Sequence, residues 1–228
     1  MSDRSFTRGK CVFCKNDYSR PGMPRHLQAC PERQAAIAAA KDQGTPEIQL
    51  YHLAIQDAYG GDYWMNLEIR ADATLYELDR FLRDIWLECC GHMSSFDIAG
   101  QSYISSLAGW WNDEDQDMSA RLDQVLSPGL EFDYQYDFGS TTSLKLRVVA
   151  ERTGALAQGQ KLQLMARNDP LEFDCAVCGQ PATVICNFCE YTLLCDTCLE
   201  EHECGEDGLL PVVNSPRMGV CGYTGDAW

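Results

Sequence analysis

Apolar and polar residues alternate along two neighbouring segments in the middle of the chain, residues 47–56 and 63–70. A period of two is typical of a β-strand that buries one face. The residues between them, Gly60-Gly61-Asp62, are those of a tight turn. The pattern therefore predicts a β-hairpin.

The spacing of apolar residues changes to that of a helix over residues 74–88, where they recur three or four positions apart. Thr74 and Glu77 have the spacing of a capping box, which predicts the start of the helix. Shorter patterns predict strands near 94–98 and 101–105, a short helix at 119–127, and longer strands at 130–137 and 143–151. We expect an α+β fold: a hairpin, a helix and further antiparallel strands.

The chain divides by composition into five segments. Two small Cys-rich modules are expected to flank a central α+β domain. The boundaries are 1–33 for the first module, 34–45 for a helical linker, 46–155 for the domain, 156–172 for a connector with one potential strand, and 173–228 for the second module. The linker is helical because 34–42 is rich in strong helix formers and is followed by Gly44-Thr45-Pro46.

The cysteines change the interpretation of both ends of the chain. The protein has 228 residues and 13 cysteines, and no apolar run reaches the roughly 18 to 20 residues that a membrane helix needs. The N-terminus lacks the apolar core of a signal peptide, so we expect a cytoplasmic protein. Because disulfides do not persist in a reducing compartment, clustered cysteines there indicate metal binding.

The first module has the ligands of one zinc ion. Cys11 and Cys14 form a CxxC knuckle, and His26 and Cys30 follow four positions apart, on one face of a helical turn that Pro24 fits at its start. Zinc prefers four nitrogen or sulfur ligands in a tetrahedron. The spacing also resembles the ubiquitin-binding fingers of DNA-repair ligases, although Gln28 stands where those fingers usually have an acidic residue.

The second module offers nine candidate ligands for two further zinc ions. They are Cys175, Cys178, Cys186, Cys189, Cys195, Cys198, His202, Cys204 and Cys221. The interleaved pairs are similar to B-box and RING-type modules. By that analogy one site is formed by Cys175, Cys178, Cys195 and Cys198, and the other by Cys186, Cys189, His202 and Cys204.

Two zinc ions need eight ligands and the module offers nine candidates, so the identity of the last ligands stays open. Cys221 lies in a knuckle-like turn and is an alternative to His202 or Cys204, and His202 is alternatively a surface residue of a Glu-rich helix. We expect about three structural Zn²⁺ ions per chain. Sites filled by four protein ligands have no open position for an activated water.

The net charge of −16 limits the kinds of partner. Residues 1–33 contain seven Lys or Arg against three Asp or Glu, so the acidic charge lies in the rest of the chain. An acidic body repels phosphate backbones. Nucleic acid could therefore be contacted only through residues 1–33.

No set of catalytic residues is evident. Tyr136-Asp137-Phe138-Gly139 contains the letters DFG, but the glycine-rich and catalytic loops of a kinase are absent. His92 has no evident partner in the sequence. An enzyme would require a cleft lined by residues such as Asp137, Tyr136 and His92.

Several longer segments carry a family resemblance. EIQLYHLAI, TLYELDRFLRDIW, FDIAGQSY and LDQVLSPGLEFDYQYDFGS, which together cover about residues 47–150, resemble the plasmid pRiA4b ORF-3-like family, also described as an insertion-element passenger family. The flanking segments SRPGMPRHLQAC and HECGEDGLLPVVNSPRMGVCGYTG are also similar to it. The resemblance implies an α+β domain, but the family has no established activity. Where the family commonly has Asp, Trp and His after YDFG, this chain has Ser140-Thr141-Thr142-Ser143-Leu144.

Three functions follow as hypotheses. The first is a non-catalytic, zinc-stabilised adaptor that binds a protein partner through its acidic body and zinc modules, with the finger as a second contact. The second is a nucleic-acid-associated protein linked to mobile elements, whose basic finger contacts DNA or RNA. The third is an enzyme with a cleft in the central domain.

Overall fold

The structure is a computed structural model that describes residues 6–42, 46–105, 115–157 and 159–225. The chain forms two compact units, which are described separately below. Unit 1 consists of Met1–Asp79, Met93–Tyr136 and Ser143–Asp169. Unit 2 consists of Arg80–His92, Asp137–Thr142 and Pro170–Trp228.

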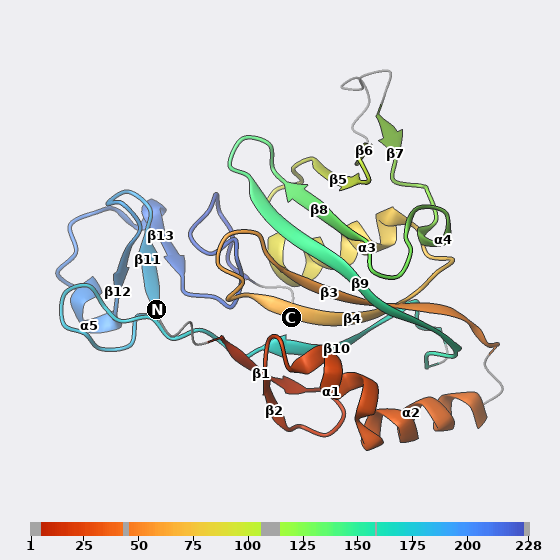
Figure 1. Cartoon of the computed structure of the whole chain (residues 1–228). Helices are drawn as coiled ribbons and strands as arrows, with labels where there is room; N and C mark the ends of the chain where they lie inside the picture. Colours follow the sequence, from red (N-terminus) through yellow and green to blue (C-terminus); the bar gives the residue numbers. More distant parts are fainter. Residues whose placement is uncertain (1–5, 43–45, 106–114, 158, 226–228) are drawn as a thin grey trace, which may run out of the picture. The chain divides into compact units, whose positions relative to one another are not determined.

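Unit 1 is built on one large sheet. Among the described residues it has ten strands in the order β2-β1-β10-β4-β3-β9-β8-β5-β6-β7 (Figure 1). Their bounds are β1 Arg8–Cys11, β2 Asp17–Ser19, β3 Ile48–Asp57, β4 Trp64–Arg70, β5 Ser94–Ile98, β6 Gln101–Ile104, β7 Gln116–Asp117, β8 Glu131–Tyr136, β9 Thr142–Gly154 and β10 Leu162–Asn168. Strand β7 runs parallel to β6, whereas β3 and β4 pair antiparallel with their neighbours. The predicted α+β class is confirmed.

The predicted hairpin is formed by β3 and β4. Its register places Leu53 opposite Leu67, and both side chains are fully buried. The carboxylate of Asp57 accepts hydrogen bonds from the backbone N–H groups of Tyr59, Gly60 and Tyr63 at 2.6–3.1 Å. Asp57 therefore stabilises the turn, because its carboxylate supplies the hydrogen-bond acceptor that these backbone N–H groups would otherwise have to find in water.

The predicted helix is also present, with a change of type near its end. Helix α3 spans Leu75–Leu82 and continues as a π-helix over Arg83–Leu87. The capping box forms as predicted, since the Thr74 N–H donates to Glu77 at 2.9 Å and the Glu77 N–H reaches Thr74 Oγ1 at 3.4 Å. In unit 1, the carboxylate of Asp79 accepts hydrogen bonds from Ser94 and Tyr134 at 2.6 and 2.7 Å, which anchors α3 to β5 and β8.

The segment treated as a connector contributes an inner strand of the sheet. Residues 162–168 form β10, which pairs with β4 on one side and with β1 of the Cys/His module on the other. The first module is thus continuous with the sheet. Gly9 permits this pairing, because a Cβ atom there would lie only 2.1 Å from the backbone oxygen of Arg167.

Two helices follow the first two strands. Helix α1 spans Met23–Ala29 and α2 spans Pro31–Asp42, three residues longer at its start than the prediction. Residues 43–45 of the predicted linker lie outside the described residues. A short helix, α4 (Leu122–Val125), falls within the predicted 119–127.

Unit 2 has little regular structure. Strands β11 (Val184–Cys186), β12 (Thr192–Leu194) and β13 (Leu209–Pro211) form a small sheet with β11 in the centre. Helix α5 (Asp196–Leu199) and a 3-10 turn at Glu206–Gly208 complete its elements. None of the helices in the described part of the chain is long and apolar enough to cross a membrane.

Candidate metal centres

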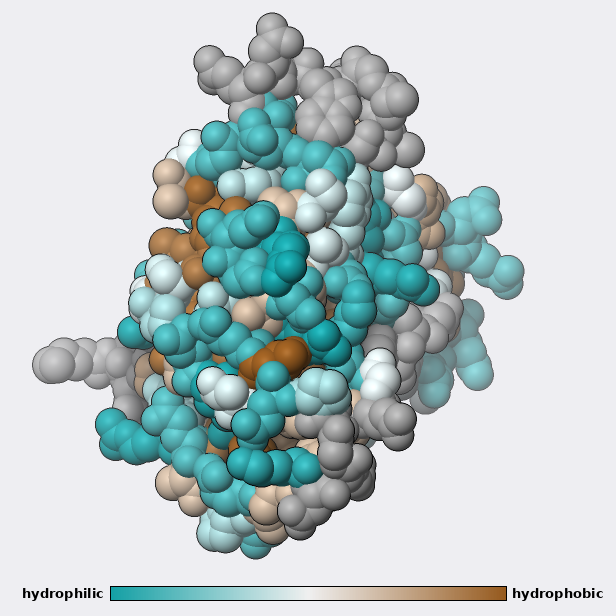
Figure 2. Space-filling model, turned by 90° about the vertical axis from the view of Figure 1, so that its right-hand side faces the viewer, coloured by the Kyte–Doolittle hydropathy of each residue, from teal (hydrophilic) through white to brown (hydrophobic). Residues whose placement is uncertain are grey.

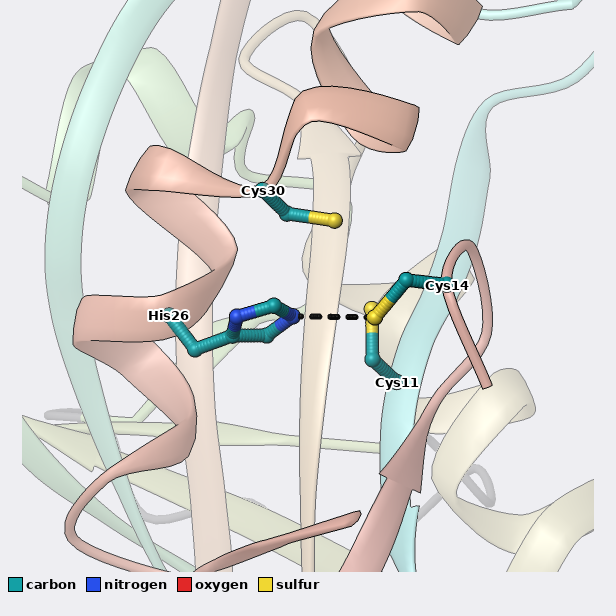
Figure 3. Close-up of side chains that lie close together, drawn as sticks. All are labelled: Cys11, Cys14, His26 and Cys30. Atoms are coloured by element: carbon teal, nitrogen blue, oxygen red, sulfur yellow. Dashed lines mark hydrogen bonds between the residues drawn. The ribbon is translucent and has the colours of Figure 1, made fainter. Parts of the chain in front are cut away.

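The first Cys/His cluster lies in unit 1 and combines Cys11, Cys14, His26 and Cys30 (Figure 3). Strand β1 ends at Cys11, and a turn with Lys15 in the left-handed region (φ 63°) brings Cys14 back beside it. His26 projects from α1 toward the two cysteines, with Nε2 lying 3.3 Å from Cys14 Sγ. Cys30 follows directly after α1 and completes the set.

This cluster rests on the sheet. Its cysteines pack in one apolar group with Trp64 of β4 and Met165 of β10. The ring of Tyr18 stacks on His26 with the ring centroids 3.8 Å apart. Burial lowers the pKa of His26, which keeps the imidazole neutral, the form that binds metal.

The second cluster lies in unit 2 and consists of Cys175, Cys178, Cys195 and Cys198. The Cys175 carbonyl accepts a hydrogen bond from the Gly179 N–H, which closes the first knuckle. Cys195 directly precedes α5, and Cys198 lies within that helix. The Sγ atoms of Cys178 and Cys195 are 3.5 Å apart. A hydrogen bond from the Cys195 backbone lowers the pKa of Cys175 to about 6, which favours the thiolate.

The third cluster, also in unit 2, consists of Cys186, Cys189, His202 and Cys204. Cys186 ends β11, and the knuckle after it uses two consecutive left-handed residues, Glu190 and Tyr191 (φ 57° and 61°). His202 Nε2 lies 3.6 Å from Cys189 Sγ. Burial opposes ionisation of Cys186, but the hydrogen bonds from His202, from Cys189 and from the backbone of Phe188 together outweigh it and lower the pKa of the thiol to about 6.

The structure groups the ligands of the second module in the interleaved manner set out from the sequence. The first and third CxxC pairs share one cluster, and the second pair joins His202 and Cys204 in the other. His202 is thus a cluster member rather than an isolated surface residue. Cys221 takes the place of neither His202 nor Cys204.

Cys221 instead belongs to a fourth cluster, in unit 2, with Cys89, Cys90 and His92. Cys89, Cys90 and His92 are not among the ligands that the sequence pattern predicts. The available signal was the short run Cys89-Cys90-x-His92, which offers three donors in four residues. The fourth donor lies 131 positions after Cys90, so local spacing could not reveal it.

The donor sets fit zinc. In each cluster the candidate ligand atoms all lie within 4.8 Å of one another. A tetrahedral zinc with bonds of about 2.0–2.3 Å requires ligand atoms roughly 3.3–3.8 Å apart. Thiolate and imidazole are donors that zinc prefers over the oxygen ligands of Mg²⁺ and Ca²⁺. Burial raises the pKa of Cys30 to about 11, which disfavours the thiolate. A bound Zn²⁺ would overcome this effect, because the ion deprotonates a coordinating thiol.

One pocket of unit 1 is not lined by the residues of the enzyme hypothesis, Asp137, Tyr136 and His92. That pocket has a volume of about 350 Å³, and its charged lining residues include Arg33, Glu68 and Arg152, with His52 beside them. Burial lowers the pKa of His52 to about 4, so the side chain is neutral at pH 7. Asp137, by contrast, pairs with Arg217 of unit 2 at 2.7 Å.

Comparisons with known proteins give little further information. No protein-family profile matches the chain, and no curated protein matches it. Among solved structures, a protein of unknown function, MM3350 from Methanosarcina mazei Go1, is similar with a TM-score of 0.43 and 17% identity. The similar region covers 52% of this chain and 67% of MM3350.

Proposed function

We propose that this protein is a zinc-stabilised, non-catalytic adaptor that binds a protein partner through its Cys-rich module and acidic surface. In this proposal three structural Zn²⁺ ions occupy the first three clusters. The observation that carries the proposal is the set of apolar side chains exposed on the zinc knuckles of unit 2.

Each of the three clusters provides four thiolate or imidazole donors. Such a set fills the tetrahedron of zinc and leaves no position for a reactive water, which is the arrangement of structural sites. Zinc bound in this way typically contributes roughly 10–16 kcal/mol of folding free energy. The second module, whose strands have only three residues each, depends on such a contribution.

Three large apolar residues on the knuckles are exposed. Val177 lies between Cys175 and Cys178 and is 70% exposed, and Phe188 lies between Cys186 and Cys189 and is 64% exposed. Tyr191, two residues after the second knuckle, is 58% exposed. Solvent-exposed aromatic and aliphatic side chains on a rigid backbone are typical contact residues of protein interfaces.

The negative net charge of the protein limits which partners it attracts. The chain carries a net charge of −16, and the face shown in Figure 2 is mostly hydrophilic, with only small separate apolar patches. Complementary charge accelerates association and disfavours acidic competitors. We therefore propose that the partner is a basic protein.

A quantitative pull-down with a knuckle variant tests the proposal. The variant Val177→Ser/Phe188→Ser/Tyr191→Ser should lose the partner that the unaltered protein recovers, because apolar contact area is removed. Its zinc content should be unchanged, because none of the three residues is a ligand. Tyr59→Ser is the matched control, since Tyr59 is 85% exposed in unit 1 and should not affect recovery.

Two outcomes reject the adaptor. One is that the intact, zinc-loaded protein recovers no specific partner. The other is that the knuckle variant recovers the same partner in the same amount as the Tyr59→Ser control.

The nucleic-acid hypothesis has weaker support from the basic residues of the finger. Arg8 pairs with Asp17 at 2.5 Å, and Arg20 donates to Gln56 and lies over the Phe6 ring. Arg33 is buried against Glu68. Three of the seven basic residues of 1–33 are therefore engaged in contacts within the protein, which leaves fewer of them to bind phosphate groups. Binding through the finger would be salt-sensitive and abolished by Arg20→Glu/Arg25→Glu.

The family resemblance remains part of the proposal. We propose from the quoted segments that residues 47–150 belong to the pRiA4b ORF-3-like family, and that any link to mobile elements follows from that membership alone.

A further inference from the structure

We propose that Cys89, Cys90, His92 and Cys221 bind a fourth zinc ion, with Asp137 and Arg217 as the residues that orient and charge-balance its ligands. This inference goes beyond the adaptor function and concerns different residues from those of the knuckle surface. It adds one metal ion to the three that the sequence predicts.

The four donor atoms form a compact set. The Sγ atom of Cys90 lies 3.6 Å from the Sγ atoms of both Cys89 and Cys221. His92 Nε2 lies 3.6 Å from Cys221 Sγ and 2.9 Å from Cys90 Sγ. Apart from the shorter Cys90–His92 distance, these values match the roughly 3.3–3.8 Å edges of a tetrahedral Cys3His zinc site.

The backbone is shaped to bring these donors together. Gly91 has φ 78°, which turns the chain sharply between Cys90 and His92. Cys221 also lies in the left-handed region, with φ 56°. A non-glycine residue in that region is uncommon and costs conformational energy, so it marks a position that the surrounding structure or a ligand holds in place.

His92 has the partner expected of a metal ligand. Its Nε2 atom faces the cysteines, and its other ring nitrogen, Nδ1, lies 3.5 Å from Asp137 Oδ1. A nearby carboxylate favours the tautomer protonated on Nδ1, which leaves the Nε2 lone pair for the metal. Zinc-binding histidines almost always have such a partner for the second nitrogen.

Arg217 links the same carboxylate to a sulfur atom of the cluster. Its side chain is fully buried and donates to Asp137 Oδ2 at 2.7 Å and to Cys89 Sγ at 3.5 Å. It also donates to the Ser140 carbonyl and the Thr142 hydroxyl. Three thiolates with one Zn²⁺ leave a charge of −1, and a buried guanidinium beside Cys89 stabilises that charge.

The site would connect three segments of unit 2. Residues 89–92 follow the π-helix, 137–141 form the loop before β9, and 212–225 follow β13. Ser215 donates a hydrogen bond to the Trp86 carbonyl at 2.6 Å, which already places the last segment beside the first. Cys90 and Cys221 are exposed, so this zinc should exchange faster than the other three.

Native mass spectrometry with elemental analysis tests the proposal on the full chain purified without chelator. The unaltered protein should carry four zinc ions, and His92→Ala and Cys221→Ser should each carry three. Replacement of zinc by Co²⁺ should give one thiolate-to-cobalt absorption component that these two variants lack.

A conservative substitution provides a second test that does not depend on loss of a ligand. Asp137→Asn should keep four zinc ions at saturation but bind one of them about 10- to 100-fold more weakly in a chelator competition. Asp133→Asn is the control, because it makes the same charge change at an exposed position of β8 and should leave all affinities unchanged.

Cysteine labelling followed by peptide mapping distinguishes bound from free thiols in the unaltered protein. During slow chelation, Cys89, Cys90 and Cys221 should react first and together, as one zinc ion is released. The proposal is overturned if the zinc-saturated protein carries three ions, or if these three cysteines react at once while all the zinc is retained. It is equally overturned if His92→Ala is folded and still carries four ions.

Discussion

Glu68 of β4 lies between two guanidinium groups in the interior of unit 1. Its carboxylate accepts hydrogen bonds from Arg33 of α2 at 2.6 Å and from Arg152 of β9 at 2.6 and 2.8 Å. Burial opposes ionisation of Glu68, but the hydrogen bonds from Arg152 and the charge of Arg33 outweigh it, so the pKa is lowered. This contribution to stability is complete above the unfolded pKa and is lost as the pH falls through the lower, folded pKa.

Glu68→Gln should lower the free energy of unfolding by about 3–5 kcal/mol, because it leaves the buried Arg33 and the partly buried Arg152 without a counter-charge. Urea denaturation at pH 7 with zinc present measures the change. Glu131→Gln is the control, because it removes an exposed partner of Arg147 (side chains 74% and 60% exposed) and should have an effect of at most about 1 kcal/mol. Equal effects of the two substitutions would contradict the role given to Glu68.

Strand β1 joins the first Cys/His cluster to the sheet through a close backbone contact. Gly9 pairs with Asn168 of β10, and a side chain at this position would meet the backbone of β10 rather than a movable side chain. Cys11 follows two residues later at the end of the same strand. The position of Cys11, one of the proposed zinc ligands, therefore depends on how closely β1 approaches β10.

Gly9→Val should displace β1, destabilise the protein by about 1–3 kcal/mol or more through overpacking, and weaken zinc binding at the first cluster. Chelator competition measures the change in zinc affinity, and the midpoint of thermal unfolding measures the change in stability. Lys10→Val places the same side chain on the exposed face of β1 and should leave zinc affinity unchanged. If Gly9→Val and Lys10→Val behaved alike, the close approach would have no energetic role.

At the scale of the whole molecule, the two units differ in what stabilises them. Unit 1 has a large sheet whose inner strands bury residues such as Leu53, Leu67 and Leu146. In unit 2, the elements around the second and third clusters are strands of three residues and a helix of four. Apolar burial thus stabilises the sheet, and we propose that metal binding stabilises the Cys-rich module.

Chelation should therefore unfold the Cys-rich module before the sheet. Hydrogen–deuterium exchange with a strong zinc chelator should show loss of protection in residues 175–211, while β3, β4 and β9 remain protected. Adding back Zn²⁺ should restore protection, and Mg²⁺ should not, because it prefers oxygen ligands. Simultaneous loss of protection in the sheet and in the module would contradict this division.

The features that could be predicted from the sequence are those with short-range causes. The hairpin follows from alternation around the Gly60-Gly61-Asp62 turn, the start of α3 from Thr74 and Glu77, and the first three Cys/His groups from spacings within about thirty residues. The place of β10 in the sheet depends on pairing with β1 and β4, strands distant in sequence. The fourth cluster depends in the same way on Cys221, and the carboxylate beside His92 comes from Asp137, 45 positions further along the chain.

Both described edges of the sheet are very short strands. Strand β2 has three residues and β7 has two. Long open edges act as templates for pairing with other chains and so favour aggregation. Strand β1 covers the seven-residue β10, which would otherwise be the edge of the sheet. In the proposed zinc-bound form, the first module therefore also protects the protein from edge-to-edge self-association, and we expect metal depletion to favour aggregation as well as unfolding.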